Sequence, residues 1–375
     1  MFRRIADNLW RFDWILFAGV FALYALGLAA IYSVSLSHDP PDFNDFHKQI
    51  IFGIIGFAMA WLAGVSRSSG WRVYGRIIYI LSIIMLFAVL LFGTTINGTR
   101  GWFSFGGLGV QPVELAKIAM VIVLAKFFSN RLQRFQSGKH VIVSAFICLS
   151  FVFLVMLQPD FGSALVLLGT WFIMLILTGM SRRVIAIILV ILLLLSLVAW
   201  LFVLQDYQKE RVAVFLNPAA DPLGSGYNVS QALIAIGSGR FFGRGLGFGS
   251  QSQLKFIPEA QTDFIFAVIA EELGFFGVAL VIICWGVIFY RLLRVARQAP
   301  DDFGLFVVLG IMSIFFIHLV VNVGMNMGLL PVMGISLPFI SYGGSFLVSS
   351  LIMLGIAQSV RIDGSTDRGE HGFNG

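Results

Sequence analysis

The sequence predicts an all-α protein that crosses a membrane several times. Of its 375 residues, 58% are hydrophobic and only 12% are charged, and the mean hydropathy is +0.92. Soluble domains are about 45–50% apolar and about 25% charged, so this chain lacks the polar residues that would cover a water-soluble body. The apolar residues form continuous runs rather than alternating ones, which favours helices over a β-barrel. The composition excludes a soluble enzyme, a nucleic-acid-binding protein with a membrane tail and a disordered chain.

Ten apolar runs are long enough to be membrane-spanning helices, since a helix needs roughly 20 residues to cross the hydrocarbon core. We expect spans at 14–34, 46–65, 74–93, 112–129, 140–157, 162–180, 184–204, 264–290, 304–328 and 343–360. The first run follows Arg3, Arg4 and Arg11, as the core of a signal peptide would. It is longer than such a core and no small-residue cleavage site follows it, so we expect it to remain as the first span.

The positions of Lys and Arg predict how these spans are oriented. Sixteen of the 25 basic residues fall on one side, namely Arg3, Arg4, Arg11, Arg67, Arg72, Arg76, Arg131, Arg134, Lys139, Arg182, Arg183, Arg291, Arg294, Arg297, Arg361 and Arg368. The short loops on the other side hold only Lys48 and Arg100. Because cytoplasmic loops carry the excess of Lys and Arg, we expect both termini in the cytoplasm. The net charge of +6 therefore reflects topology and predicts no nucleic-acid partner.

One long segment, residues 205–262, separates the seventh span from the eighth. The alternation of sides makes it extracytoplasmic, and loops of this length are usually functional. Its apolar stretch at 229–236 is too short to span, so we expect an amphipathic helix along the membrane interface. The glycine-dense run at 237–249 lacks the G-x-G-x-x-G spacing and a surrounding β-α-β pattern, which excludes a dinucleotide-binding fold.

Ionisable residues inside the expected spans are candidates for function because burying them in lipid is costly. Glu114 and Lys117 stand three residues apart on one helix face, where an intrahelical ion pair and a functional role are equally compatible with the pattern. Asp160 is placed to cap the helix that follows it. Glu271 and Glu272 point to different faces, so at least one should line a polar cavity or bond a neighbouring helix.

Three further features lie towards the outer ends of the last spans. Asp263 ends the long loop and opens an apolar helix, so it can be a helix cap or a general base for a lipid-linked headgroup. Residue type alone favours the cap. His318 is interpreted as a packing residue. Pro331 and Pro338 interrupt helix at membrane depth, which is tolerated only where the backbone is buried in protein or lines a cavity.

Several short motifs follow one another in a characteristic order. They are Gly101-Trp102-Phe103, Gln111-Pro112-Val113-Glu114-Leu115-Ala116-Lys117, Gln158-Pro159-Asp160-Phe161-Gly162, Asp221-Pro222-Leu223-Gly224-Ser225-Gly226-Tyr227, Ile236-Gly237-Ser238-Gly239, Pro258-Glu259-Ala260-Gln261-Thr262-Asp263-Phe264-Ile265-Phe266-Ala267, Glu271-Glu272-Leu273-Gly274, Leu330-Pro331, Ser336-Leu337-Pro338 and Ser341-Tyr342-Gly343-Gly344. Each motif alone is weak, but the ordered set resembles the SEDS family (shape, elongation, division and sporulation proteins), most closely its rod-elongation branch. The resemblance implies one transmembrane domain over 1–361 and leaves 362–375 as a polar, disordered cytoplasmic tail.

The resemblance also implies a function, that of a peptidoglycan glycosyltransferase in the bacterial cytoplasmic membrane. Such an enzyme polymerises lipid II at the outer face of the membrane during cell-wall elongation. The resemblance further implies that Asp263 is the catalytic general base. Residues expected in substrate binding or in the cavity are Glu114, Lys117, Asp160, Arg211, Arg240, Arg244, Lys255, Glu271 and Glu272. A divalent cation, Mg²⁺ or Mn²⁺, would bind with the substrate diphosphate.

Partners implied by the resemblance are a single-span transpeptidase of the class B penicillin-binding proteins (PBP2-type), other elongation-complex proteins and membrane lipids, with no nucleic acid. Two other functions remain open from the sequence. A lipid II flippase would also use broken helices and buried polar groups. A non-catalytic scaffold for the transpeptidase is the second alternative.

Overall fold

The structure is a computed structural model that describes residues 12–96, 98–105, 108–131, 138–202, 206–217 and 225–371. The helices are α2 (Trp14–Leu36), α3 (Asn44–Val65), α4 (Ser68–Phe92), α5 (Pro112–Ser129), α6 (Gly138–Met156), α7 (Phe161–Leu177), α8 (Arg182–Phe202), α9 (Asp206–Leu216), α10 (Ser225–Gly239), α11 (Ser250–Gln253), α12 (Ile265–Arg297), α13 (Asp302–Asn326) and α14 (Gly344–His371). Three short strands, β1 (Thr94–Ile96), β2 (Thr99–Phe105) and β3 (Leu108–Val110), lie between α4 and α5.

Each of the ten expected spans coincides with a helix, and the chain is a multi-pass membrane protein. Within the described residues, eight helices are long and apolar enough to cross a membrane: α2, α3, α4, α6, α8, α12, α13 and α14. The other two expected spans are α7, which is apolar but only 17 residues long, and α5, which carries Glu114, Lys117 and Lys126. Charge and length set these two helices apart, and both of them contribute to the cavity described below.

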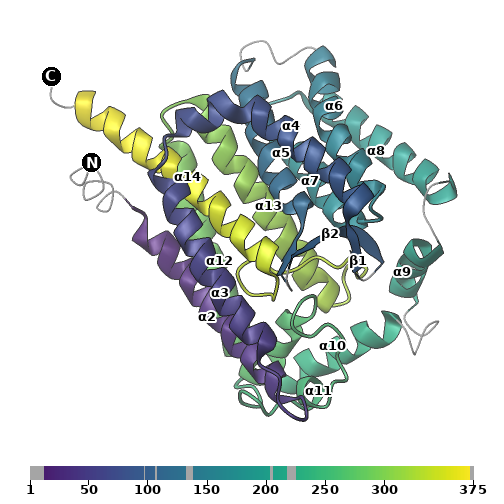
Figure 1. Cartoon of the computed structure of the whole chain (residues 1–375). Helices are drawn as coiled ribbons and strands as arrows, with labels where there is room; N and C mark the ends of the chain where they lie inside the picture. Colours follow the sequence, from purple (N-terminus) through teal and green to yellow (C-terminus); the bar gives the residue numbers. More distant parts are fainter. Residues whose placement is uncertain are drawn as a thin grey trace.

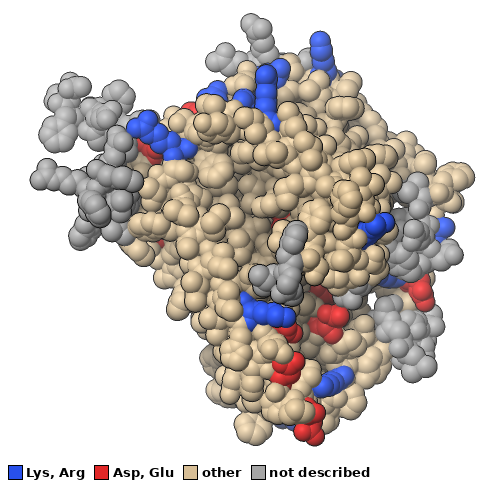
Figure 2. Space-filling model, in the orientation of Figure 1, with Lys and Arg blue, Asp and Glu red and all other residues tan. Residues whose placement is uncertain are grey.

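The helices differ sharply in how deeply they lie in the bundle. In their most apolar stretches, 72% of the residues of α13 and 78% of those of α14 are buried, whereas only 6% of those of α8 are. Figure 1 accordingly shows α8 at the edge of the bundle, and α14 lies along α3. Figure 2 shows a largely uncharged belt between an upper end with Lys and Arg and a lower end where Asp and Glu are more frequent. This distribution suits a bundle whose middle faces lipid.

The small sheet was not expected from the sequence, and it is a minor addition to the mostly helical fold that was predicted. Its strands are antiparallel in the order β1-β2-β3, and β2 packs against α4 and α5. Two of its strands have only three residues, which is too few for an alternating hydrophobic pattern to be recognised. The sheet brings Thr99 and Trp102 to the outer end of α5.

The segment 205–262 is largely helical rather than irregular. It contains α9, α10 and α11, and α10 covers the stretch 229–236 for which a helix was expected. The Asp221 motif falls in 218–224, outside the described residues. In Figure 1, α10 and α11 lie at the lower end of the bundle, where they pack against α12, and α9 lies at the right edge.

The C-terminal end also differs from the prediction, because α14 continues to His371 and makes 362–371 helical. The carboxylate of Asp363 accepts hydrogen bonds from the backbone N–H and the hydroxyl of Ser68, at 2.7 and 2.6 Å. Ser68 begins α4, and an acidic group is stabilised at a helix N-terminus. This tertiary contact joins the beginning of the expected tail to α4, and residues 372–375 lie outside the described part.

Candidate functional site

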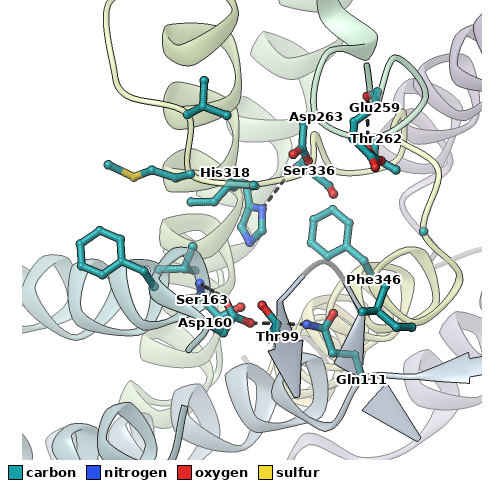
Figure 3. A pocket seen from close by; sticks show the side chains of 18 of the residues that line it. Thr99, Gln111, Asp160, Ser163, Glu259, Thr262, Asp263, His318, Ser336 and Phe346 are labelled. Atoms are coloured by element: carbon teal, nitrogen blue, oxygen red, sulfur yellow. Dashed lines mark hydrogen bonds between the residues drawn. The ribbon is translucent and has the colours of Figure 1, made fainter. Parts of the chain in front are cut away.

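A cavity of about 460 Å³ opens at the end of the bundle where α5, α7 and α12 begin. Its polar lining comes from five parts of the chain: the β2–α5 region, the start of α7, α9–α10, the turn before α12, and α13 with the irregular segment after it. The polar and charged side chains that line it are Thr99, Gln111, Glu114, Lys117, Asp160, Ser163, Arg211, Asn228, Glu259, Thr262, Asp263, His318, Ser336 and Tyr342. Figure 3 shows Asp263 and Asp160 on opposite sides of this cavity, with His318 between them.

Asp263 is held in place through its backbone. Its carbonyl oxygen accepts hydrogen bonds from the side-chain amides of Asn322 and Asn326, at 3.1 and 2.9 Å. Asn326 also accepts a hydrogen bond from the backbone N–H of Ala267 in the first turn of α12. The N-cap residue of α12 is Phe264, and neither its side chain nor that of Asp263 forms a capping hydrogen bond. The interpretation of Asp263 as a helix cap is therefore wrong, and its carboxylate is not used to start α12.

The environment of Asp263 raises the pKa of its carboxyl group to about 6. Burial is the largest cause, and the negative charge of Glu259 adds to it, whereas the guanidinium of Arg211 acts in the opposite direction. A carboxyl group with this pKa is still mainly ionised at pH 7 and accepts a proton more readily than an ordinary aspartate. These are the properties of a general base near neutral pH.

The irregular segment 327–343 fixes the turn that carries Asp263. Ser341 donates a hydrogen bond from its hydroxyl to the carbonyl of Thr262 at 2.6 Å, and the N–H of Tyr342 donates to the carbonyl of Gln261 at 2.8 Å. Asn322 donates to the carbonyl of Ile335 in the same segment at 2.8 Å. The expectation of broken helix that is buried or lines a cavity is confirmed, because residues 331–336 line the cavity.

Glu114 and Lys117 form the ion pair that their spacing allows, with 2.9 Å between the Lys117 ammonium and the Glu114 carboxylate. Both side chains are buried and both line the cavity. Ser349 of α14 contacts the other Glu114 oxygen at 3.4 Å. The structural and the functional interpretation of this pair are thus both compatible with its position.

Asp160 caps α7, as expected, by accepting a hydrogen bond from the N–H of Ser163 at 2.9 Å. It also lines the cavity, where Gln111 donates to its second carboxylate oxygen at 3.4 Å. Gly162 follows in the same motif, and a Cβ at this position would lie only 2.6 Å from the carbonyl oxygen of Met333. Only glycine therefore lets the first turn of α7 approach the irregular segment so closely.

Of the four basic residues of segment 205–262 that were expected near the substrate, the structure places Arg211 in the cavity lining and the other three outside it. Arg240, Arg244 and Lys255 have exposed side chains. The backbone of Arg240 and Arg244 bonds to α12 around Gly274, whose φ of 62° kinks that helix. The backbone of the loop covers this kink, and the three exposed basic residues are not part of the cavity lining. Their expected contact with the substrate stays a prediction.

Glu271 and Glu272 also lie outside the cavity lining, contrary to that part of the expectation. Glu271 accepts hydrogen bonds from the N–H groups of Gln251 and Ser252, at 2.8 and 3.0 Å, at the start of α11. Glu272 accepts from the hydroxyls of Ser33 on α2 and Ser252. The expected bond to a neighbouring helix is confirmed for Glu272. These carboxylates fasten the outer loop to the bundle.

Sequence reasoning missed the polar side of α13. His318, Asn322 and Asn326 are spaced four residues apart, so they share one face of a helix, and all three are buried. His318 lines the cavity and its ring also stacks on Phe346, so its interpretation as a packing residue stays open. The signal was available, since three polar residues at i, i+4 and i+8 in an apolar span indicate a common partner.

Within the described residues, no group of three or more His, Cys, Asp or Glu side chains could hold a metal ion. Asp263 and Glu259 are the nearest pair of carboxylates at the cavity. This donor set does not form a protein cage for a resident ion.

Comparison with known proteins identifies relatives of the whole chain. The family model for FtsW, RodA and SpoVE, described as a cell cycle protein, matches residues 13–365. Stage V sporulation protein E of Bacillus subtilis is 38% identical over 90% of this chain and 93% of the relative. Peptidoglycan glycosyltransferase MrdB of Escherichia coli is 40% identical over 78% of each chain.

Solved structures give the same result. A chain from a structure described as the structural coordination of polymerization and crosslinking by a peptidoglycan synthase complex has a TM-score of 0.79 and 33% identity. It covers 94% of this chain and 98% of that one. The rod shape determining protein RodA of Thermus thermophilus has a TM-score of 0.69 at 29% identity, over 94% and 97% of the two chains. The protein described here therefore belongs to the FtsW/RodA/SpoVE, or SEDS, family.

Proposed function

We propose that the chain is a peptidoglycan glycosyltransferase that polymerises lipid II at the outer face of the bacterial cytoplasmic membrane during cell-wall elongation. The observation that carries this proposal is a half-buried carboxylate, Asp263, with a pKa of about 6 in a cavity that also contains the guanidinium of Arg211. Relatives named peptidoglycan glycosyltransferase MrdB and probable peptidoglycan glycosyltransferase FtsW support it, at 40% and 36% identity.

The reaction assigns Asp263 the role of general base. Its carboxylate takes the proton from the C4 hydroxyl of the acceptor GlcNAc, and that oxygen attacks the anomeric carbon of the donor MurNAc. The bond from this carbon to undecaprenyl diphosphate breaks, and the diphosphate leaves with the electron pair. Direct displacement converts the α-linked donor into a β-linked glycan, so a single base and no covalent intermediate are sufficient.

The leaving diphosphate develops negative charge that needs a cation near it. Arg211 and Lys117 are the basic residues in the described cavity lining. Arg211 acts on Asp263 electrostatically and donates to the carbonyl of Val332 at 3.4 Å, so it stands near the proposed base. We therefore propose Arg211, before Lys117, as the cation that binds the diphosphate of the donor. Gln111, Asp160 and the aromatic rings of the lining are suited to sugar hydroxyls and ring faces.

A divalent cation, Mg²⁺ or Mn²⁺, belongs to the proposal only as an ion carried by the substrate diphosphate. The described side chains do not form a cage of their own, so no step of the reaction is assigned to it. Removing the ion with a chelator tests this requirement directly.

The proposed partner is a single-span transpeptidase of the class B penicillin-binding proteins. The related chain with a TM-score of 0.79 comes from a peptidoglycan synthase complex, which supports a partner of this kind. The role in elongation rests on the resemblance of the motifs. Relatives from sporulation, elongation and division are 38%, 40% and 36% identical, and these similar values do not separate the branches.

The experiment is polymerisation of labelled lipid II by purified protein in detergent, alone and with its cognate transpeptidase, with and without chelator. Glycan strands that lengthen with time, and that are absent with Asp263→Asn, are the expected result. A flippase has no second leaflet to use in detergent and yields no strands. A scaffold yields strands only from its partner, so wild-type strand yields from the Asp263→Asn complex would contradict the proposal.

A further inference from the structure

A short chain of hydrogen bonds crosses the deep end of the cavity. The Lys117 ammonium lies 2.9 Å from a Glu114 oxygen and 3.2 Å from Nε2 of His318. The Nδ1 atom of His318 lies 3.0 Å from the carbonyl oxygen of Ser336 in the irregular segment. His318 is 3% exposed and Lys117 is 1% exposed, yet both line the cavity. The chain therefore joins α5, α13 and the irregular segment beneath the proposed substrate site.

The chemistry of the two outer partners determines which nitrogen of His318 carries the proton. An ammonium group only donates hydrogen bonds, so Nε2 of His318 must accept and is unprotonated. A backbone carbonyl only accepts, so Nδ1 must carry the hydrogen that is donated to Ser336. Both contacts require the same form of the ring, a neutral imidazole protonated on Nδ1.

This form of His318 has a consequence for Lys117. An ammonium has three N–H groups, of which Glu114 accepts one and His318 accepts a second. Among the described residues no other acceptor is in contact with it, and the Phe346 ring lies 5.3 Å away. A neutral acceptor fixes the direction of the third N–H without removing positive charge. That third N–H is left for a ligand in the cavity.

His318 also connects this cation to the turn that carries Asp263. Ser336, which accepts its hydrogen bond, follows Ile335, whose carbonyl accepts from Asn322. The same Asn322 amide donates to the carbonyl of Asp263. His318 and Asn322 are four residues apart on α13, so one helix face positions both ends of the cavity.

We infer that His318 is a positioning residue whose neutral, Nδ1-protonated ring aims the third N–H of Lys117 at an anionic oxygen of the substrate, in the class of phosphate or diphosphate esters. The identity of that substrate rests on the proposed function, whereas the ring form and its contacts do not. The competing role is simple packing, since the His318 ring stacks on Phe346 with centroids 4.7 Å apart.

Three substitutions separate positioning from packing. His318→Phe keeps a flat ring for Phe346 but has no polar atom, and His318→Gln places an acceptor near Lys117. His318→Asn keeps a donor for Ser336 and loses the acceptor. We expect kcat/KM for lipid II to fall at least about tenfold in His318→Phe, which is what losing a hydrogen bond to a charged group is worth, and less in His318→Gln.

Thermal unfolding of the same proteins completes this test. The matched control is Ser313→Ala, because Ser313 is a buried polar residue of the same helix that bonds only to Leu309 within it. The kcat/KM of Ser313→Ala should equal that of the wild type. Wild-type kcat/KM in His318→Phe would overturn the inference, as would a loss in His318→Gln as large as in His318→Phe when both proteins keep the wild-type melting temperature.

A spectroscopic measurement does not depend on activity. The ¹⁵N spectrum of full-length protein labelled on histidine should contain a neutral, Nδ1-protonated ring at pH 7 that is missing in His318→Gln. An imidazolium signal or an Nε2-protonated ring at this position would overturn the inference. If the ring has the expected form but the wild-type protein makes no glycan, the proposed function fails and the assignment of the ring stands.

Discussion

Asp263 and the pair Glu271–Glu272 are buried or half-buried carboxylates within ten residues of each other, yet their surroundings are opposite. Glu271 and Glu272 accept hydrogen bonds from backbone N–H groups and hydroxyls of the outer loop and of α2. Among the described residues no donor bonds the Asp263 carboxylate, and the residue is held through its backbone N–H and carbonyl. A carboxylate that accepts hydrogen bonds from several segments of the chain stabilises the fold, whereas one that faces a cavity without protein donors is available for chemistry.

The largest expected effect comes from removing the base. Asp263→Asn keeps the size and the backbone contacts of the residue but cannot take a proton, so polymerisation should fall by about 10²–10⁴-fold, the typical value of general base catalysis. The matched Glu272→Gln variant should retain at least half of the wild-type rate. Both rates are measured with purified protein and labelled lipid II, and equal losses in the two variants would remove the distinction drawn above.

The next effect concerns the cations. Arg211→Gln removes the guanidinium next to Asp263 and should lower kcat/KM by about 10-fold to 100-fold, the range for one charge-assisted hydrogen bond. Arg244→Gln is the control, because its side chain is exposed outside the cavity lining. A larger loss in Arg244→Gln than in Arg211→Gln would show that the donor lies over the outer loop instead.

The pH dependence of the rate sharpens the assignment of the base. The raised pKa of Asp263, about 6, means that the carboxylate is protonated and inactive as a base below that value. We expect kcat/KM to fall about tenfold for each pH unit below 6 and to be flat between 7 and 8. Arg211→Gln removes a charge that lowers the pKa of Asp263, so the acidic fall in kcat/KM of this variant should move to higher pH. A fall in the wild-type rate that begins only near pH 4 would contradict the proposed environment of Asp263.

The smallest effect on the polymerisation rate, and the clearest effect on stability, is expected at Glu271. Glu271→Ala leaves the first N–H groups of α11 without their acceptor, and an unpaired buried donor costs about 1–3 kcal/mol. The melting temperature should fall while the rate at 25 °C changes less than about twofold. Thermal unfolding in detergent measures the melting temperature, and the lipid II assay measures the rate. A lost rate with an unchanged melting temperature would place Glu271 in the site.

Much of the fold could be predicted from the sequence because each span satisfies a local rule. Hydrophobic runs set the ten helices, and the spacing of Glu114 and Lys117 predicted their ion pair. The cap formed by Asp160 also follows from residue type and position. The three-stranded sheet could not be predicted, since its short strands carry no periodic signal.

The site was predicted less completely, because the residues that meet at the cavity come from distant parts of the chain. Arg240, Arg244 and Lys255 belong to the same loop region as the proposed base, but sequence proximity does not fix where a long side chain points. His318, Asn322 and Asn326 share one face of α13, which indicates a common partner. The sequence did not show what that partner is, because the groups they bond lie in other parts of the chain.

The sequence by itself determined that this protein lives in a membrane, where its helices lie, and which family motifs it carries. These follow from composition, hydrophobic length and residue order, which need no knowledge of distant contacts. Only the tertiary structure decided which charges share a cavity and which are used to close a loop. The reason is physical: the behaviour of a buried carboxylate or imidazole depends on the donors and acceptors around it, and those come from α5, α13 and the irregular segment together.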